Sequence, residues 1–402
     1  MRAGRLSGAL GLLIAVAAGA CRAQEVTARW VISSDPALVE LAADLLPDLA
    51  ERSGLELREP VRIERRSRED LVRYLHGKLD EEMPSEEARA TVEVYALLGL
   101  VPADLDLRSV LLGLYTEQVA GYYEPDSTAL FVMDDQPDEA LEALLVHELV
   151  HALQDQSTDL DALTDRALGN DRAVAAQTAI EGHATLVMLE YMTERMVGAP
   201  IDLAEIPDFA AQMRPALEAM RSQFPALAGA PLIIQESLLF PYVEGTAFVQ
   251  SLWAAGDRVA PFEARLPSST EQVLTRGRAA EPLDLELAAA TGTIVREDVL
   301  GRLEVAVLLR EHGPDEAAAD GWDGDRYALV ESADGTRSLA WYALWEDEAA
   351  RDRFLGAMTA AVRDLGAGAS IEAVEVGARP ATLLRVGGGP NVRARICVAE
   401  GA

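Results

Sequence analysis

The segment LLVHELVHALQDQ, residues 144–156, places two histidines and a glutamate in a run that is otherwise mostly leucine, valine and alanine. The chain has only five histidines, and His147 and His151 stand four residues apart in this run. On a helix, residues four apart lie on the same face, about 5–6 Å apart between Cβ atoms. The two imidazoles can therefore reach one metal ion, and zinc is the usual ion for such ligands.

Glu148 lies about 100° further around the same helix from His147. It is therefore a poor third ligand, but its carboxylate can contact a water molecule at the metal. A carboxylate in this place can accept the proton of that water while the water attacks a carbonyl carbon. This is the His-Glu-x-x-His arrangement of metallopeptidases.

The alternative interpretation is a chance pattern in which ordinary hydrogen bonds satisfy both histidines. The surrounding sequence ALLVHELVHAL is apolar on nearly all sides, so the helix is expected to be buried. Burying two imidazoles and a carboxylate without partners costs several kcal/mol, on the order of one lost hydrogen bond each. A bound metal removes that cost, so the sequence favours one zinc ion per chain.

The third ligand is expected on a second long helix, about residues 171–196. The metzincin family of zinc peptidases extends this motif with a glycine and a third histidine, at positions where this chain has Gln154 and Ser157, so the chain does not resemble that family. On the second helix, Glu181 lies inward on a stripe of apolar or small residues, where a carboxylate needs a cation. His183 is the rival, but it lies about 200° around the helix and is expected to be exposed or behind the ligands. The stripe consists of Val174, Thr178, Glu181, Thr185, Met188 and Met192.

These motifs resemble the gluzincin class of zinc metallopeptidases, which is thermolysin-like in active-site plan. More closely, the chain is similar to a family of poorly characterised bacterial HExxH proteins, often predicted to be lipoproteins. The resemblance covers roughly residues 60–345 and implies a peptidase with ligands His147, His151 and Glu181 and the base Glu148. It is carried by GYYEPDSTALFVMDD, HELVHALQDQ, AIEGHATLVM, FPYVEGTAFV, STEQVL and GWDGDRYALVE.

The chain departs from that family at two places. His183 stands where the family often has aspartate, and Thr275 and Arg276 stand where it usually has His-Pro. If the family's histidine stabilises the transition state, this chain lacks it. The departure favours an alternative function, a zinc-stabilised binding or envelope-structural lipoprotein that has lost activity.

Other candidate site residues follow from the same resemblance and from chemistry. In gluzincins an antiparallel edge strand beside the zinc helix binds the substrate main chain, and residues 129–133 are the candidate here, with an ordinary structural strand as the alternative. Tyr242 and Tyr123 are candidate hydroxyl donors to the transition-state oxyanion, although either can equally be a core residue. Asp155, one turn beyond His151, is either the acceptor for the second ring nitrogen of that histidine or a solvated helix-end carboxylate.

Along the chain, the patterns predict an α+β protein with two domains. Residues 25–290 are expected to form a mostly helical domain, with a hairpin around a Pro-Asp-Ser turn just before the histidine helix. Helices are expected to continue to about residue 290. Residues 295–402 contain short β-prone runs around one helix and predict a small α+β domain with an antiparallel sheet.

The first residues predict export. Arg2 and Arg5 precede an apolar run too short to cross a membrane, as in a signal peptide over residues 1–20. The sequence AAGAC resembles the lipobox of bacterial lipoproteins, which makes Cys21 the candidate lipidated residue and membrane anchor. Ordinary export to the periplasm or medium, with cleavage after Ala20, is the alternative. If Cys21 is lipidated, Cys397 is a lone thiol, and it is expected to be buried.

The net charge of −32 argues against nucleic-acid binding, because phosphates would be repelled. A peptide or protein substrate is the expected partner. The sequence therefore predicts an exported zinc metallopeptidase in the cell envelope.

Overall fold

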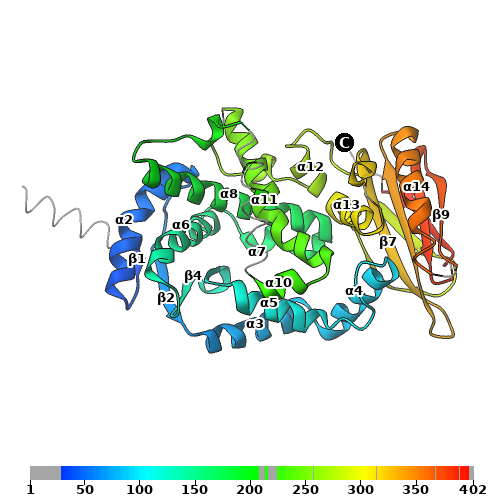
Figure 1. Ribbon diagram of the computed structural model, residues 1–402, viewed down its shortest axis with the longest axis horizontal. Coiled ribbons are helices and arrows are strands. Elements are labelled where there is room, and N and C mark those ends of the chain that lie inside the picture. The colour runs from blue at the N-terminus through cyan, green and yellow to red at the C-terminus, as the bar shows by residue number, and fades with distance from the viewer. Residues whose placement is uncertain are drawn as a thin grey trace, which may run out of the picture.

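The computed structural model describes residues 29–207, 212, 214–215, 224–256, 258–313, 315–366, 368–388 and 390–397. Helices make up most of the part up to residue 274, and a sheet-rich part follows it, as Figure 1 shows. The predicted α+β class is confirmed. The predicted signal peptide and Cys21 lie outside the described residues.

The helical part is built from long helices joined by short turns. Its helices are α2 (Pro36–Ser53), α3 (Arg68–Glu82), α4 (Ser85–Leu97), α5 (Leu107–Gln118), α6 (Asp138–Asp155), α7 (Leu160–Leu163), α8 (Asn170–Val197), α10 (Pro225–Gly229), α11 (Leu232–Ala254) and α12 (Thr270–Leu274). Single 3₁₀ turns are η1 (Pro125–Ser127), η2 (Arg166–Leu168), η3 (Leu203–Glu205) and η4 (Glu263–Arg265).

A four-stranded sheet accompanies these helices, in the order β1 (Val31–Ile32), β2 (Val61–Arg66), β4 (Ala129–Met133) and β3 (Gly121–Glu124). β3 and β4 form the predicted antiparallel hairpin around η1. The expectation that residues 129–133 form the edge strand is wrong, because β4 also pairs with β2 in parallel and β3 occupies the edge. The five residues of β4 are all buried, which suits an unbroken apolar run inside a sheet.

α8 and α11 cross at a pair of glycines. A Cβ atom on Gly182 would lie 2.0 Å from the carbonyl carbon of Gly245, and one on Gly245 would lie 2.1 Å from the oxygen of Thr178. Any larger residue would therefore force the two backbones apart. The crossing sets the distance between α8, which carries Glu181, and α11, which carries Tyr242.

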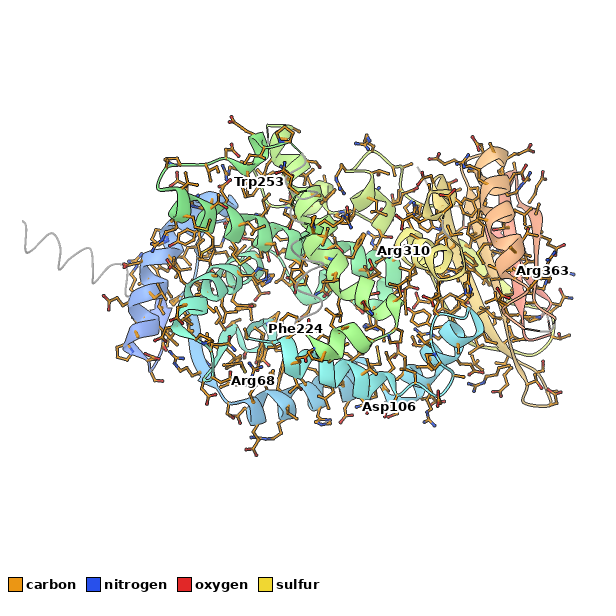
Figure 2. All side chains as sticks on the ribbon, viewed as in Figure 1. Arg68, Asp106, Phe224, Trp253, Arg310 and Arg363 are labelled. Carbon is orange, nitrogen blue, oxygen red and sulfur yellow. The ribbon has the colours of Figure 1, made fainter. Side chains whose placement is uncertain are left out.

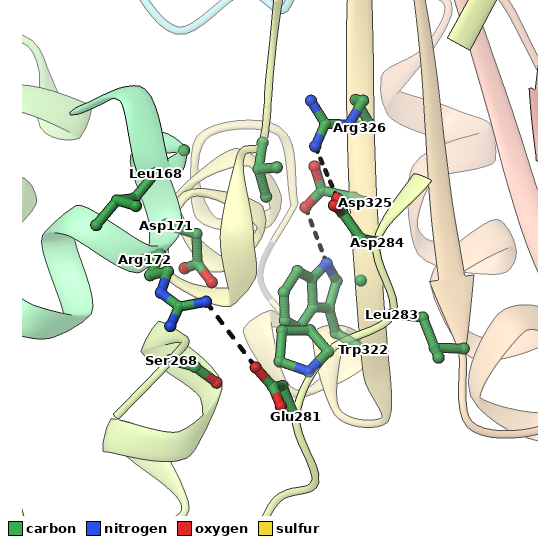
Figure 3. A pocket seen from close by; sticks show the side chains of 14 residues that line it. Leu168, Asp171, Arg172, Ser268, Glu281, Leu283, Asp284, Trp322, Asp325 and Arg326 are labelled. Atoms are coloured by element: carbon green, nitrogen blue, oxygen red, sulfur yellow. Dashed lines mark hydrogen bonds and ion pairs between the residues drawn. The ribbon is translucent and has the colours of Figure 1, made fainter. Parts of the chain in front are cut away.

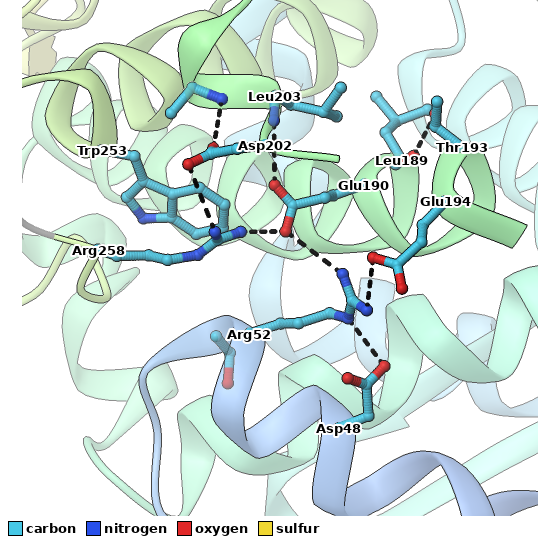
Figure 4. A network of polar contacts seen from close by, with 12 residues as sticks. Asp48, Arg52, Leu189, Glu190, Thr193, Glu194, Asp202, Leu203, Trp253 and Arg258 are labelled. Atoms are coloured by element: carbon cyan, nitrogen blue, oxygen red, sulfur yellow. Dashed lines mark hydrogen bonds and ion pairs between the residues drawn. The ribbon is translucent and has the colours of Figure 1, made fainter. Parts of the chain in front are cut away.

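The C-terminal end of α2 is fastened to α8 by a network of charges, drawn in Figure 4. Arg52 pairs with Glu194 at 2.9 Å and with the buried Glu190 at 3.5 Å. Arg258 also pairs with Glu190 and lies 4.6 Å over the ring of Trp253. The network fixes the last turn of α2 beside the middle and end of α8.

The C-terminal part is a layered sheet. A five-stranded antiparallel sheet has the order β6 (Thr293–Asp298), β7 (Trp322–Glu331), β8 (Arg337–Trp345), β10 (Arg379–Val386) and β9 (Ser370–Val376). Residues such as Trp341 and Trp345 pack against α13 (Gly301–His312), which η5 (Glu316–Ala319) follows, and against α14 (Glu348–Ala361). The alternate residues pack against a second, two-stranded sheet of β5 (Leu285–Ala289) and β11 (Val392–Ile396).

The expectation that helices continue to about residue 290 is wrong. α12 ends at Leu274, and β5 follows it with buried Leu285 and Leu287 on either side of exposed Glu286. This period of two is typical of a strand, although the segment is too short to stand out among helical patterns.

The two parts share one hydrophobic core. At their junction Tyr95 of α4 donates to Glu304 of α13 at 2.8 Å, and Arg310 of α13 pairs with Glu236 of α11 at 2.9 Å. Figure 2 shows Arg310 where the helices meet the sheet. The predicted domain boundary near residues 290–295 therefore falls within a continuously packed molecule.

Two further observations concern the surface. Cys397 is exposed, so the expectation that it is buried is wrong. Within the described ranges, no helix has both the length and the apolar character needed to cross a bilayer.

Candidate metal centre

Helices α6 and α8 bring the three predicted ligands together. Nε2 of His147 lies 3.1 Å from Nε2 of His151 and 3.2 Å from Oε2 of Glu181. Nε2 of His151 lies 3.4 Å from the same carboxylate oxygen. Across the described part of the chain, this is the group of histidine, cysteine and acidic side chains close enough together to hold a metal ion.

These separations fit a tetrahedral zinc site. Bonds of about 2.0–2.1 Å with tetrahedral angles place neighbouring ligand atoms about 3.3 Å apart. The three separations lie between 3.1 and 3.4 Å. Two imidazole nitrogens and one carboxylate oxygen are also the donor set that zinc takes in catalytic sites, where a fourth position stays open for water.

Glu148 lies beside this group but is not part of it. Its side chain is 7% exposed, and its carboxylate accepts a hydrogen bond from the backbone N–H of Tyr123. Burial raises the pKa of Glu148, and the neighbouring His147 and His151 offset only part of the shift. A carboxylate with a raised pKa is a stronger base than an ordinary one.

The ionisation of the ligand group favours the binding of a positive ion. Burial disfavours the charged form of His151, but Glu181 beside it raises the pKa of that histidine to about 9. Burial also disfavours the charge of Glu181, yet His151 and His147 hold its pKa below the usual range. Glu181 is therefore an anion at neutral pH, inside a core that needs a positive partner for it.

The acceptor behind His151 is Gln154, and the prediction of Asp155 for this role is wrong. Nδ1 of His151 donates to Oε1 of Gln154 at 2.8 Å. Asp155 instead accepts a hydrogen bond of 2.8 Å from the hydroxyl of Tyr123. Gln154 is fully buried on the side of α6 that faces α8, where its longer side chain reaches back one turn. Its polar side chain in an apolar stretch is the sequence signal that could have identified it.

His183 is fully buried and stands behind the ligands, as one of its two predicted locations requires. Its Nδ1 faces Nε2 of Gln154 at 3.0 Å, and its Nε2 faces the carbonyl oxygen of Ser53 at 3.1 Å. The rings of Trp253 and Phe262 lie edge-on to it. Burial lowers the pKa of His183 to about 3, so this histidine is neutral.

Of the two candidate tyrosines, Tyr242 lies over the ligand group. Its ring centroid is 6.3 Å from that of His147, and the side chain is 39% exposed, so solvent reaches the group from this side. Glu181 and burial raise the pKa of Tyr242, which keeps its hydroxyl a donor. The hydroxyl of Tyr123 instead donates its hydrogen bond to Asp155.

Thr275 and Arg276 stand where His-Pro is usual in the resembling family. Thr275 donates its hydroxyl to the carbonyl oxygen of Glu271 at 2.8 Å. Arg276 has a positive φ of 58°, pairs with Glu244 at 2.9 Å and donates to the carbonyl oxygen of Val273 at 2.8 Å. Glu244 is also paired with Arg214. These contacts give Arg276 a structural role beside α11.

A separate hollow of about 230 Å³, shown in Figure 3, lies between the start of α8 and β7. Asp171, Trp322 and Asp325 are among its lining residues. The ligand group does not contribute to its walls.

Comparison with known proteins gives one partial match. Residues 289–398 match a family described as a domain of unknown function, DUF8575. The matched range is the sheet-rich C-terminal part and contains none of the metal-site residues. No curated protein and no solved structure matches the chain.

Proposed function

We propose that this chain is an exported zinc metallopeptidase that hydrolyses internal peptide bonds. The observation that carries the proposal is the convergence of His147, His151 and Glu181 at 3.1–3.4 Å, with the buried Glu148 beside them. A structural zinc site has four protein ligands and needs no base. Three ligands with an adjacent basic carboxylate fit a catalytic site better.

In this proposal each residue of the site has a separate role in peptide hydrolysis. When bound, zinc supplies a Lewis acid that polarises the substrate carbonyl and makes water more acidic. Glu148 accepts the proton of the attacking water and later gives it to the leaving amine. Tyr242 donates its hydroxyl hydrogen bond to the oxygen that becomes negatively charged.

The free edge of β3 is the proposed binding strand for the substrate main chain, in place of β4. Met133 N–H donates to Ala120 C=O, so Ala120 and Met133 form a hydrogen-bonded pair. Hydrogen-bonded and non-hydrogen-bonded pairs alternate along an antiparallel hairpin. In antiparallel register, Gly121 and Tyr123 therefore direct their backbone groups away from β4. Because Tyr123 N–H reaches Glu148, this edge adjoins the ligand group. An extended peptide can add to such an edge by main-chain hydrogen bonds.

A zinc-stabilised binding or envelope-structural lipoprotein is the second candidate. It is favoured by Thr275, which stands where the resembling family has a histidine and whose hydroxyl donates to the carbonyl oxygen of Glu271. For either function we propose a bacterial cell-envelope location with a lipid at Cys21. Metabolic labelling with a fatty acid tests the anchor, and an unlabelled, soluble wild type would contradict it.

Glu148→Gln tests the peptidase proposal. The substitution keeps the shape and hydrogen-bonding reach of the side chain but removes the base, whose contribution is roughly 10²–10⁴-fold. We expect zinc content and Tm close to wild type and cleavage of an unfolded protein substrate slowed by that factor. Glu139→Gln, at an exposed position on the same helix, is the control and should retain full activity. Equal activity in wild type and Glu148→Gln, or none in a zinc-loaded wild type, would contradict the proposal.

A further inference from the structure

A chain of four hydrogen-bonded groups runs from the end of α2 to the candidate metal site. It begins at the carbonyl oxygen of Ser53, the last residue of α2, which faces Nε2 of His183 at 3.1 Å. Carbonyls in the last turn of a helix have no partner within the helix. Because a carbonyl oxygen only accepts, Nε2 of His183 carries a hydrogen and donates it.

The next link is Gln154, and its orientation is fixed by a second carbonyl. Nε2 of Gln154 donates to the carbonyl oxygen of Ile180 at 3.0 Å, so this atom is the amide nitrogen rather than the oxygen. The same nitrogen lies 3.0 Å from Nδ1 of His183. Since an amide nitrogen only donates, Nδ1 of His183 is bare and accepts its second hydrogen.

The last link determines the state of His151. With its nitrogen directed to Ile180 and His183, Gln154 presents Oε1 to Nδ1 of His151 at 2.8 Å. An amide oxygen only accepts, so Nδ1 of His151 carries a hydrogen. Nε2 is then the atom of His151 that offers a lone pair, and it is the atom 3.1–3.4 Å from His147 and Glu181.

We infer that Ser53, His183 and Gln154 form a positioning relay that sets the tautomer and ring orientation of His151 for metal binding. Two backbone carbonyls, that of Ser53 at its first end and that of Ile180 beside Gln154, allow one direction of donation throughout. The inference rests on the proposed metal site, but it does not require peptidase activity.

The surroundings make the relay rigid. Ser53, Gln154 and His183 are all fully buried, so water does not replace a lost partner. Trp253 and Phe262 confine the ring of His183 edge-on. Arg52, the neighbour of Ser53, is tied to Glu194 at 2.9 Å and so holds the end of α2 in register with α8. A fully satisfied buried network of this kind favours a single arrangement.

The experiment combines ring-nitrogen NMR with zinc affinity. In zinc-loaded wild type labelled with ¹⁵N-histidine, His183 should be neutral with its proton on Nε2, and His151 should carry an exchange-protected proton on Nδ1. Five histidines in the chain keep such a spectrum assignable. A proton on Nδ1 of His183 would reverse the chain and overturn the relay.

Variants supply the second readout, measured by competition with a chelator. Gln154→Leu and His183→Phe should each weaken zinc binding roughly 10–100-fold. Gln154→Glu keeps an acceptor for His151 and should recover part of that affinity, which a purely structural role does not predict. His76→Phe, at an exposed histidine, should bind zinc as wild type does.

The outcomes separate the relay from the metal site. Folded Gln154→Leu and His183→Phe with wild-type zinc affinity would overturn the relay while leaving the metal site intact. Failure of wild type to bind zinc would overturn the metal site, and the tautomer of His183 would still decide the direction of the hydrogen bonds. If the variants fail to fold, the wild-type spectrum alone decides.

Discussion

Glu181 is the residue on which the metal site depends most, because it is the ligand of the three that α8 supplies. We predict that His147→Ala and His151→Ala abolish tight zinc binding. Glu181→Ala should weaken it and also lower Tm, since the buried His151 and the half-buried His147 lose their anionic partner and the metal loses an anchor between helices. Zinc stoichiometry, expected at one per chain, and chelator competition measure the effect.

The matched control is Met196→Ala on the same helix. Its side chain is 84% exposed, so zinc affinity and Tm should stay at wild-type values. Wild-type affinity in Glu181→Ala together with lost affinity in His183→Ala would show that the ligand assignment is wrong.

At the scale of elements, the crossing of α8 and α11 is the feature that positions the site. Gly182→Ala places a Cβ atom 2.0 Å from the backbone of Gly245, so the helices must separate. We predict a loss of at least about 1–3 kcal/mol in unfolding free energy, as for an overpacked core, together with weaker zinc binding. Urea unfolding and chelator competition check both effects.

Gly113→Ala is the control for this prediction. A Cβ atom at Gly113 of α5 meets nothing within 4 Å, so alanine should be neutral or stabilise the helix by up to about 1 kcal/mol. A Gly182→Ala variant as stable as Gly113→Ala would mean that the crossing tolerates a side chain.

The elements also explain which features the sequence could predict. His147, His151 and Glu181 follow from helical spacing, because one helix or one stripe fixes where each side chain points. The order of strands does not follow from local pattern. The prediction therefore placed β4 at the edge, although β4 pairs in parallel with β2, whose Arg62 is paired with Ala129 across 67 residues of sequence. β5 pairs with β11 about a hundred residues later, and the sequence around residue 285 does not predict that pairing.

At the site, too, the sequence could not decide which side chain would contact the second ring nitrogen of His151. Gln154 and Asp155 are adjacent in the sequence, and either can contact a ring one turn away. The packing of α6 on α8 decides between them, because it buries Gln154 against Ile180 and leaves Asp155 to Tyr123. The hydrogen bond of His183 depends on α2, whose end is 130 residues away in the chain.

At the scale of the whole molecule, buried carboxyl groups gather where α8, α12, α13 and β7 meet. Burial is the main cause of a raised pKa in each of them, and neighbouring carboxyls add to it for Asp171, Glu271 and Glu304. Figure 3 shows two of them, Asp171 and Asp325, beside the hollow at this junction. The pKa values are about 7 for Asp171, about 8 for Glu271, about 8 for Glu304 and about 6 for Asp325.

This junction makes stability depend on pH in a definite direction. The carboxyls bind protons more tightly in the folded chain than in the unfolded chain, whose values stay near 4. Their stabilising effect is therefore complete below about pH 4 and is lost as pH rises through the folded values. We predict that Tm, measured with excess chelator so that metal release plays no part, falls by several degrees between about pH 5 and pH 9.

Asp171→Asn isolates the cause. Oδ1 of Asp171 accepts hydrogen bonds from the backbone and hydroxyl of Thr270, and an amide oxygen can keep both without ionising. The variant should therefore show a flatter fall in Tm than wild type across the same range. Asp364→Asn, at an exposed carboxylate, should reproduce the wild-type slope. A Tm that rises with pH in wild type, or an unchanged slope in Asp171→Asn, would show that these carboxyls do not cause the pH dependence of Tm.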